Sequence, residues 1–193
     1  MARTPSTMLP LGTPAPDFRL PDFDGRMQGL GDFTAAPALL VAFVCNHCPF
    51  VRHLRGEFAA FAREFAPRGL AVVAINSNDI AAYPQDGPDA MGQEAAELGY
   101  VFPYLLDESQ AVAKAYRAAC TPDFFLFDAA RRLVYRGQFD DSRPGNGRPV
   151  TGADLRAAVE ATLGGGTPNP EQFPSLGCNI KWRKGAEPDY ASG

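Results

Sequence analysis

The sequence predicts an α/β fold of three layers, in which a central mixed β-sheet is flanked by helices. Residues 38–44 and 70–75 are apolar runs without polar alternation, which is typical of strands covered on both faces. Between them, residues 49–65 carry apolar side chains at intervals of three and four, the pattern of an amphipathic helix. Strand, helix and strand in this order predict a right-handed βαβ unit with parallel strands.

The segment before the first central strand predicts an arm and a hairpin. Residues 1–16 contain four prolines, which exclude a helix and favour an extended arm on the domain surface. Residues 17–20 and 26–30 flank the turn-forming pair Asp24-Gly25, so we predict a small N-terminal β-hairpin.

The second half of the chain alternates predicted helices and strands. Gly164 and the two glycines after it end the last helix, so the folded domain is predicted to span residues 1–166. Residues 167–193 hold four prolines and the only tryptophan, and predict an irregular C-terminal tail packed on the domain. The predicted elements are a helix over 89–98, a strand over 104–106, a helix from Ser109 to about residue 119, a hairpin of strands 123–127 and 132–136, and a helix from Thr151 to Leu163.

Composition and charge exclude several classes of protein. A chain of 193 residues with a net charge of −4 has no cationic field for nucleic acid. Its longest apolar run, residues 38–44, is far below the roughly 20 residues of a membrane helix. The N-terminus lacks an apolar stretch of signal-peptide length, so we expect a cytoplasmic protein without membrane or nucleic-acid partners, either a monomer or a homodimer.

Two cysteines stand at the junction between a predicted buried strand and a predicted helix. The run C-N-H-C-P over residues 45–49 has C-x-x-C spacing, which allows Cys45 and Cys48 to close a disulfide. Unpaired N–H groups and the helix dipole stabilise a thiolate there, so we predict a lowered pKa for Cys45, with His47 stabilising the anion further. A stable thiolate predicts a more oxidising pair than one with a Gly-Pro insert.

The alternatives for this pair are two small buried side chains or half of a metal site. A zinc site needs a second C-x-x-C motif or a spaced pair of histidines. His47 and His53 are the only histidines, and Cys120 and Cys178 each stand alone. We therefore predict no metal and no cofactor.

A second motif lies just before the phenylalanine-rich strand. With the C-x-x-C motif and the order of elements, the Thr121-Pro122 pair resembles the thioredoxin-like superfamily, in which a cis-proline packs against the redox cysteines. The resemblance implies that Thr121 and Pro122 shape a substrate groove, because the residue before such a proline pairs with an extended substrate. A trans-proline opening an ordinary strand is the alternative.

The N-terminal string G-T-P-A-P-D-F over residues 12–18 narrows the resemblance to the alkyl hydroperoxide reductase / thiol-specific antioxidant branch, the redoxins. Peroxiredoxins of this branch carry a proline and a hydroxyl residue at fixed positions before the peroxide-attacking cysteine. Ala38 and Ala42 occupy those positions here. The sequence therefore departs from fast peroxidase chemistry.

Thioredoxins also place a buried carboxylate beneath the redox pair to move a proton. The strand over 38–44 contains none. Asp79 and Asp123 are candidate substitutes, with turn and capping roles as the alternative. Cys120 and Cys178 are possible accessory thiols, with simple burial as the alternative for Cys120.

Together these residues predict a thiol-disulfide oxidoreductase in which Cys45 attacks a substrate disulfide and Cys48 resolves the mixed disulfide. The expected partners are a disulfide-containing protein or small-thiol substrate and a thiol electron donor. One alternative is a thiol peroxidase with Cys45 as the peroxidatic cysteine. Another is a binding module that holds a metal through both cysteines and His47, or a partner through the tail.

Overall fold

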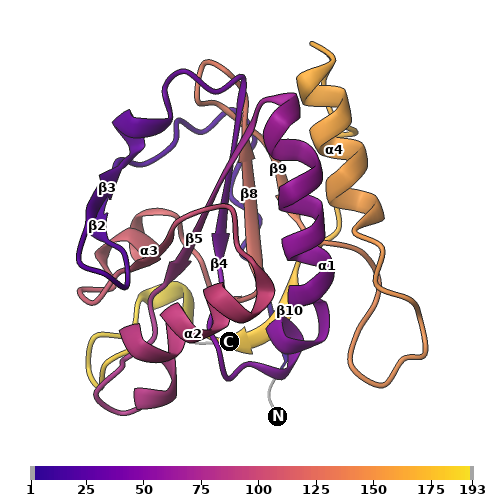
Figure 1. The fold of residues 1–193 in the computed structure, drawn as a ribbon. Coiled ribbons are helices and arrows are strands. Elements are labelled where there is room, and N and C mark those ends of the chain that lie inside the picture. The colour runs from indigo at the N-terminus through magenta and orange to yellow at the C-terminus, as the bar shows by residue number, and fades with distance from the viewer. Residues whose placement is uncertain (1–2, 192–193) are drawn as a thin grey trace.

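A computed structural model describes residues 3–191 and builds them around a five-stranded sheet with strand order β6-β5-β4-β8-β9 (Figure 1). The strands are β1 (Thr4–Pro5), β2 (Arg19–Pro21), β3 (Met27–Gly29), β4 (Ala38–Phe43), β5 (Leu70–Asn76), β6 (Tyr104–Leu106), β7 (Cys120–Thr121), β8 (Asp123–Phe127), β9 (Leu133–Gly137) and β10 (Leu176–Asn179). The α-helices are α1 (Pro49–Phe65), α2 (Pro88–Leu98), α3 (Ala111–Ala115) and α4 (Ala153–Leu163), and short 3-10 helices cover Leu30–Phe33, Ala66–Arg68, Pro84–Asp86 and Asp189–Ala191.

Strand β4 is the centre of the sheet. It pairs in parallel with β5, antiparallel with β8, and all of its residues are buried. β6 extends the parallel side and β9 the antiparallel side. The predicted βαβ unit and mixed sheet are confirmed, because an unbroken apolar run suits only a strand with covered faces.

Helices cover both faces of the sheet, which confirms the three predicted layers. In Figure 1, α1 and α4 lie along one face and α3 lies on the other, beside the β2–β3 hairpin. Phe58 of α1 shows the packing of the first layer, with ring centroids 5.4 Å from Phe102 and 5.5 Å from Phe124. On the other face, Tyr116 and Phe125 meet edge to face at 5.7 Å.

Two elements differ from the sequence predictions. The helix expected from Ser109 is shorter, because Gln110 has a left-handed backbone and α3 ends at Ala115. The tail is largely irregular, as predicted, but it also contributes β10, which pairs with β1 on one side and β7 on the other. The boundary at residue 166 stays a prediction. Within residues 3–191, no helix combines the length and apolar character needed to cross a membrane.

Candidate active site

The two cysteines of the C-x-x-C motif lie where the central strand passes into the first helix. Cys45 follows the end of β4, and Cys48 is the N-cap of α1, with Pro49 at its first helical position. Proline suits this position because it lacks the N–H that a first helical turn leaves unpaired. Both thiols are free and buried, with Cys45 only 1% exposed.

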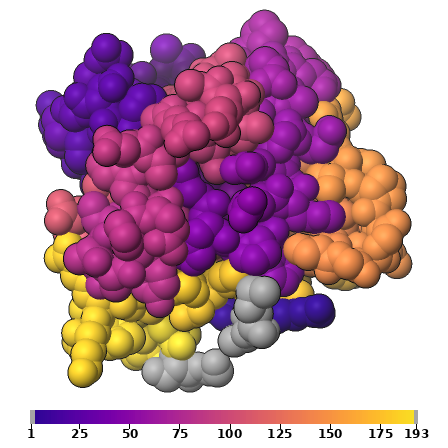
Figure 2. All heavy atoms as spheres, turned by 60° about the horizontal axis from the view of Figure 1, so that its bottom comes forward, coloured from indigo at the N-terminus to yellow at the C-terminus, as the bar shows by residue number. Residues whose placement is uncertain are grey.

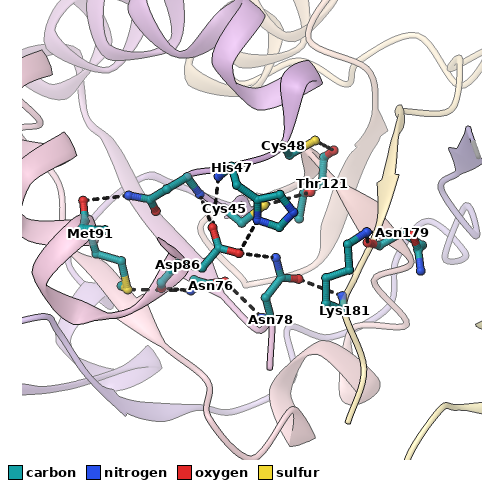
Figure 3. Close-up of polar contacts among 12 residues, drawn as sticks. Cys45, His47, Cys48, Asn76, Asn78, Asp86, Met91, Thr121, Asn179 and Lys181 are labelled. Carbon is teal, nitrogen blue, oxygen red and sulfur yellow. Dashed lines mark hydrogen bonds and ion pairs between the residues drawn. The ribbon is translucent and has the colours of Figure 1, made fainter. Parts of the chain in front are cut away.

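Thr121 contacts both sulfurs of the pair. The peptide bond between Thr121 and Pro122 is cis, which confirms the expectation from the thioredoxin-like resemblance. The Cys45 Sγ lies 3.5 Å from the Thr121 hydroxyl, and the Cys48 thiol donates to the Thr121 carbonyl oxygen at 3.1 Å (Figure 3). Thr121 therefore lies within reach of any reaction at either cysteine.

Asp86 is a site residue that the sequence did not reveal. It is fully buried, and its Oδ1 accepts the backbone N–H groups of Asn46 and His47 at 2.9 and 3.0 Å. Its Oδ2 accepts the Asn78 side-chain amide at 2.9 Å and lies 2.5 Å from His47 Nδ1. The carboxylate thus holds the backbone between the two cysteines (Figure 3).

His47 is oriented by this carboxylate and by an aromatic ring. Its imidazole stacks on Tyr83 with ring centroids 5.4 Å apart and planes 7° from parallel. Its side chain is 24% exposed, whereas both cysteines of the motif are buried. The Nδ1 contact of His47 is to Asp86, and the stabilisation of the Cys45 anion by His47 stays a prediction.

The tail is joined to the same network. The Lys181 backbone N–H donates to Asn78 Oδ1 at 2.8 Å, while the Asn78 amide donates to Asp86. Figure 2 shows the start of α1 between the α2 region and the tail. The hydrogen bonds from Lys181 to Asn78 and from Asn78 to Asp86 join the tail to the loop before α2. The tail and the loop after β5 therefore close around the motif from two sides.

The predicted low pKa of Cys45 is wrong. Three effects raise it well above its usual value: a hydrogen bond to Cys48, burial, and the negative charge of Asp86. The helix begins after Cys48, three residues beyond Cys45.

Cys48 has the lowered pKa instead. The causes are hydrogen bonds from the thiols of Cys178 and Cys45, followed by those from the Thr121 hydroxyl and the Val51 backbone N–H, which together outweigh burial. The Thr121 carbonyl also accepts the Cys48 proton when the thiol form is present. Cys48 thus has partners for both of its protonation states, which suits a group that gains and loses a proton.

The two other cysteines have different surroundings. Cys178 on β10 lies opposite Thr121, and its interaction with Cys48 raises the pKa of Cys178. Cys120 lies on β7, but its thiol donates to the Pro122 carbonyl at 3.5 Å and contacts neither redox sulfur by a hydrogen bond. Burial raises the pKa of Cys120 as well. The structure therefore brings Cys178 to the pair and leaves Cys120 as a buried side chain.

Neither carboxylate considered from the sequence contacts the pair. Asp79 Oδ1 accepts the Ala81 N–H within its own loop. Asp123 is buried on β8, where burial raises its pKa to about 7, and its Oδ2 accepts the Ala119 N–H at 3.4 Å. The carboxylate beside the motif is Asp86.

One set of side chains in residues 3–191 has the spacing of a metal site. A ligand atom of Cys45, of His47 and of Asp86 all lie within 4.8 Å of one another. The Asp86 oxygens already accept two backbone N–H groups and the Asn78 amide, which occupy the lone pairs that a cation would use. Hydrogen bonds to Asp86 account for the closeness of His47 in this cluster, and the absence of a metal stays a prediction.

A model of the AhpC/TSA family matches residues 11–136, more than half of the chain. The chain belongs to the AhpC/TSA family. The matched region contains both cysteines of the motif and Thr121, whereas Cys178 lies beyond it.

Three individual proteins are similar to this chain. The thiol-disulfide oxidoreductase ResA of Geobacillus thermodenitrificans is 27% identical over 128 residues, which are 65% of this chain and 67% of ResA. A crystal structure from Sinorhizobium meliloti 1021 is 59% identical, covers 94% of this chain and 100% of its own, and has a TM-score of 0.93. Another, from Geobacillus kaustophilus, is 52% identical with a TM-score of 0.94, covering 96% of this chain and 99% of its own.

Proposed function

We propose that the protein is a thiol-disulfide oxidoreductase in which Cys45 and Cys48 exchange disulfides with a protein or small-thiol substrate. The contact of Thr121 with both sulfurs of the C-x-x-C pair carries this proposal. Membership of the AhpC/TSA family and the similarity to ResA support it.

The first step uses the unequal pKa values of the pair. The interaction between the two thiols raises the pKa of Cys45 and lowers that of Cys48, so the reduced pair shares one proton. As the Cys45 Sγ attacks one sulfur of the substrate disulfide, Cys48 takes up this proton. A mixed disulfide forms on Cys45, and the other substrate sulfur leaves as a thiolate.

The second step reverses the role of Cys48. Its thiol, held by the Thr121 carbonyl at 3.1 Å, gives up the proton and attacks the Cys45 Sγ. The Cys45–Cys48 disulfide forms, and the remaining substrate sulfur takes the proton and leaves. A thiol electron donor then restores the reduced pair.

Asp86 is a positioning residue in this account. It holds the backbone N–H groups of Asn46 and His47, and its charge keeps the proton on Cys45 until attack begins. Since Cys45 is 1% exposed, exchange with an external disulfide requires the covering tail or loop to move.

The proposal is tested by the reduction of insulin disulfides in the presence of dithiothreitol. We expect Cys45→Ser to lower the catalysed rate to that of dithiothreitol alone, because the attacking sulfur is gone. Cys120→Ala is the matched control and keeps the wild-type rate. Full activity of Cys45→Ser would overturn the proposal.

A thiol peroxidase is the second candidate, and the Thr121 hydroxyl beside Cys45 favours it. A hydroxyl at this distance can hold a peroxide oxygen as the sulfur attacks. We expect the protein to react with hydrogen peroxide no faster than a free thiol, since Ala38 and Ala42 stand where peroxiredoxins place proline and a hydroxyl residue. A rate far above that of free cysteine would favour the peroxidase instead.

A further inference from the structure

The tail strand β10 pairs with the short strand β7 that precedes Pro122. Cys178 lies opposite Thr121, and Asn179 lies opposite Cys120, in antiparallel register. The Ile180 N–H extends the pairing to the Ala119 carbonyl at 3.1 Å. Main-chain pairing with an edge strand is how an extended peptide binds to many sheets. The tail strand β10 therefore occupies the position beside the redox pair that an added peptide strand would take.

Gly177 permits this close approach. A Cβ at residue 177 would collide with the carbonyl oxygen of Thr121, within the same β10–β7 contact. Glycine within a strand commonly marks such an approach of another backbone. The residue before Cys178 thus brings the two strands together at the site.

Cys178 lies on a strand in contact with α1, the helix whose N-cap is Cys48. It pairs with Thr121 across β10 and β7, and the carbonyl oxygen of Thr121 accepts the Cys48 thiol at 3.1 Å. The two thiols influence each other: the pKa of Cys48 is lowered and that of Cys178 is raised. Thr121 therefore links Cys178 to the redox pair, because it also contacts the Cys45 sulfur.

We propose that Cys178 is a third redox thiol, which exchanges with the Cys45–Cys48 disulfide and holds it as a Cys48–Cys178 disulfide. This inference rests on the proposed dithiol function. The Cys178 thiol loses its proton and attacks the Cys48 Sγ. The Cys48–Cys178 bond forms, the Cys45–Cys48 bond breaks, and Cys45 leaves as a thiolate that takes up one proton. The number of disulfides is unchanged, so the step needs no further oxidant.

The exchange moves the disulfide toward the surface. Cys178 is 7% exposed, against 1% for Cys45 and none for Cys48. A thiol electron donor that attacks Cys178 would reduce the protein from the tail side, while Cys45 is already free for the next substrate. The class of partner that this predicts is a reductant that approaches β10.

Disulfide mapping tests the proposal on the full chain. The protein is oxidised with glutathione disulfide, alkylated, and digested with trypsin, which places Cys45 and Cys48 on peptide 27–52, Cys120 on 118–131 and Cys178 on 157–181. We expect a 27–52 to 157–181 cross-link with the alkyl group on Cys45. Cys178→Ala loses the cross-link, and the matched control Cys120→Ala keeps it.

The Cys45→Ser variant separates this proposal from the proposed function. It cannot form the Cys45–Cys48 disulfide, yet we expect it to form the 27–52 to 157–181 cross-link. If wild-type protein forms the Cys45–Cys48 disulfide while Cys178 stays fully alkylated, the third thiol is refuted and the dithiol stands. A cross-link through Cys45, with the alkyl group on Cys48, would also overturn the proposal.

A variant at Gly177 changes the position of β10 while all four cysteines are retained. Gly177→Ala is expected to displace β10 and to lower the yield of the cross-link, while the Cys45–Cys48 disulfide still forms. Gly56→Ala is its matched control, because a Cβ at residue 56 meets no atom within 4 Å. An unchanged cross-link yield in Gly177→Ala would contradict the role given to the strand.

Discussion

Both sulfurs of the motif contact Thr121 on β7, but Cys45 lies beside Asp86 of the loop between β5 and α2, whereas Cys48 lies beside Cys178 of the tail. On the loop side, the negative charge of Asp86 helps to raise the pKa of Cys45. On the tail side, Cys178 and the Val51 N–H supply donors that lower the pKa of Cys48. Two thiols three residues apart thus differ in charge because distant segments surround them. The spacing of a C-x-x-C motif does not reveal which sulfur carries the thiolate.

Replacing Cys48 is expected to change the rate of disulfide exchange more than any other substitution, because Cys48 serves both Cys45 and the tail. Cys48→Ser takes away the base for Cys45 and the resolving thiol, so attack by Cys45 slows by roughly 10²–10⁴-fold. Glutathione disulfide should then leave a lasting glutathione adduct on Cys45, seen by mass spectrometry of the intact protein. Rapid attack without a lasting adduct would show that another group performs both roles.

Asp123 shows what a buried carboxylate does when donors are few. Its pKa is raised to about 7 by burial, against about 3.9 in an unfolded chain. The unfolded chain releases this proton first, so stability falls as pH rises from about 4 to about 7. The loss is about 4 kcal/mol at most. Urea unfolding across this pH range measures it.

The variant Asp123→Asn should remove this pH-dependent loss, because an amide has no proton to release. The exposed Asp24→Asn is its matched control and should keep the wild-type slope. An unchanged slope in Asp123→Asn would assign the pH dependence to another group.

Asp86→Asn should weaken the contacts between the β5–α2 loop and the C-x-x-C motif. The variant keeps an oxygen for the Asn46 and His47 N–H groups but places an amide against Asn78, so the free energy of unfolding falls by about 1–3 kcal/mol. Loss of the charge lowers the pKa of Cys45, which speeds its alkylation near neutral pH. Asp79→Asn, in the same loop, should change neither quantity. Slower alkylation of Cys45 in Asp86→Asn would contradict the claim that the Asp86 charge raises the pKa of Cys45.

Cys178→Ala should give the smallest effect of the series, and on the tail side alone. It removes the thiol that most lowers the pKa of Cys48, so this pKa rises while Cys45 keeps the Asp86 charge beside it. Thiolate absorbance followed against pH reports the shift. Cys120→Ala, at a buried cysteine on the neighbouring strand, should leave the curve in place. Equal shifts in both variants would remove the distinction between these cysteines.

The sequence predicts those parts of the molecule that depend on local pattern. The apolar run of β4 and the helical spacing of α1 require covered faces, so the motif between them could be placed at a strand end. The resemblance placed Thr121 and Pro122 beside it. These features account for the sheet, its layers and half of the site.

The part of the site that the sequence does not predict depends on contacts between residues far apart in the chain. Asp86 lies in a loop 40 residues from Asn46 in the sequence. The only sequence signal for a polar site here is the pair Asn76 and Asn78 at the end of β5, because parallel strands bring polar groups to one edge of the sheet. β10 is four residues long in a proline-rich tail, and β7 supplies its partner. Gly177 next to Cys178 was the one local sign of a close approach.

A redox titration tests the exchange chemistry most directly. The protein is equilibrated in glutathione buffers of graded potential, alkylated, and examined by mass spectrometry of the peptide 27–52. We predict one two-electron transition between about −270 and −120 mV in which the protein loses two alkylation sites, at least one of them on this peptide. Full alkylation of Cys45 and Cys48 at every potential would contradict a dithiol oxidoreductase.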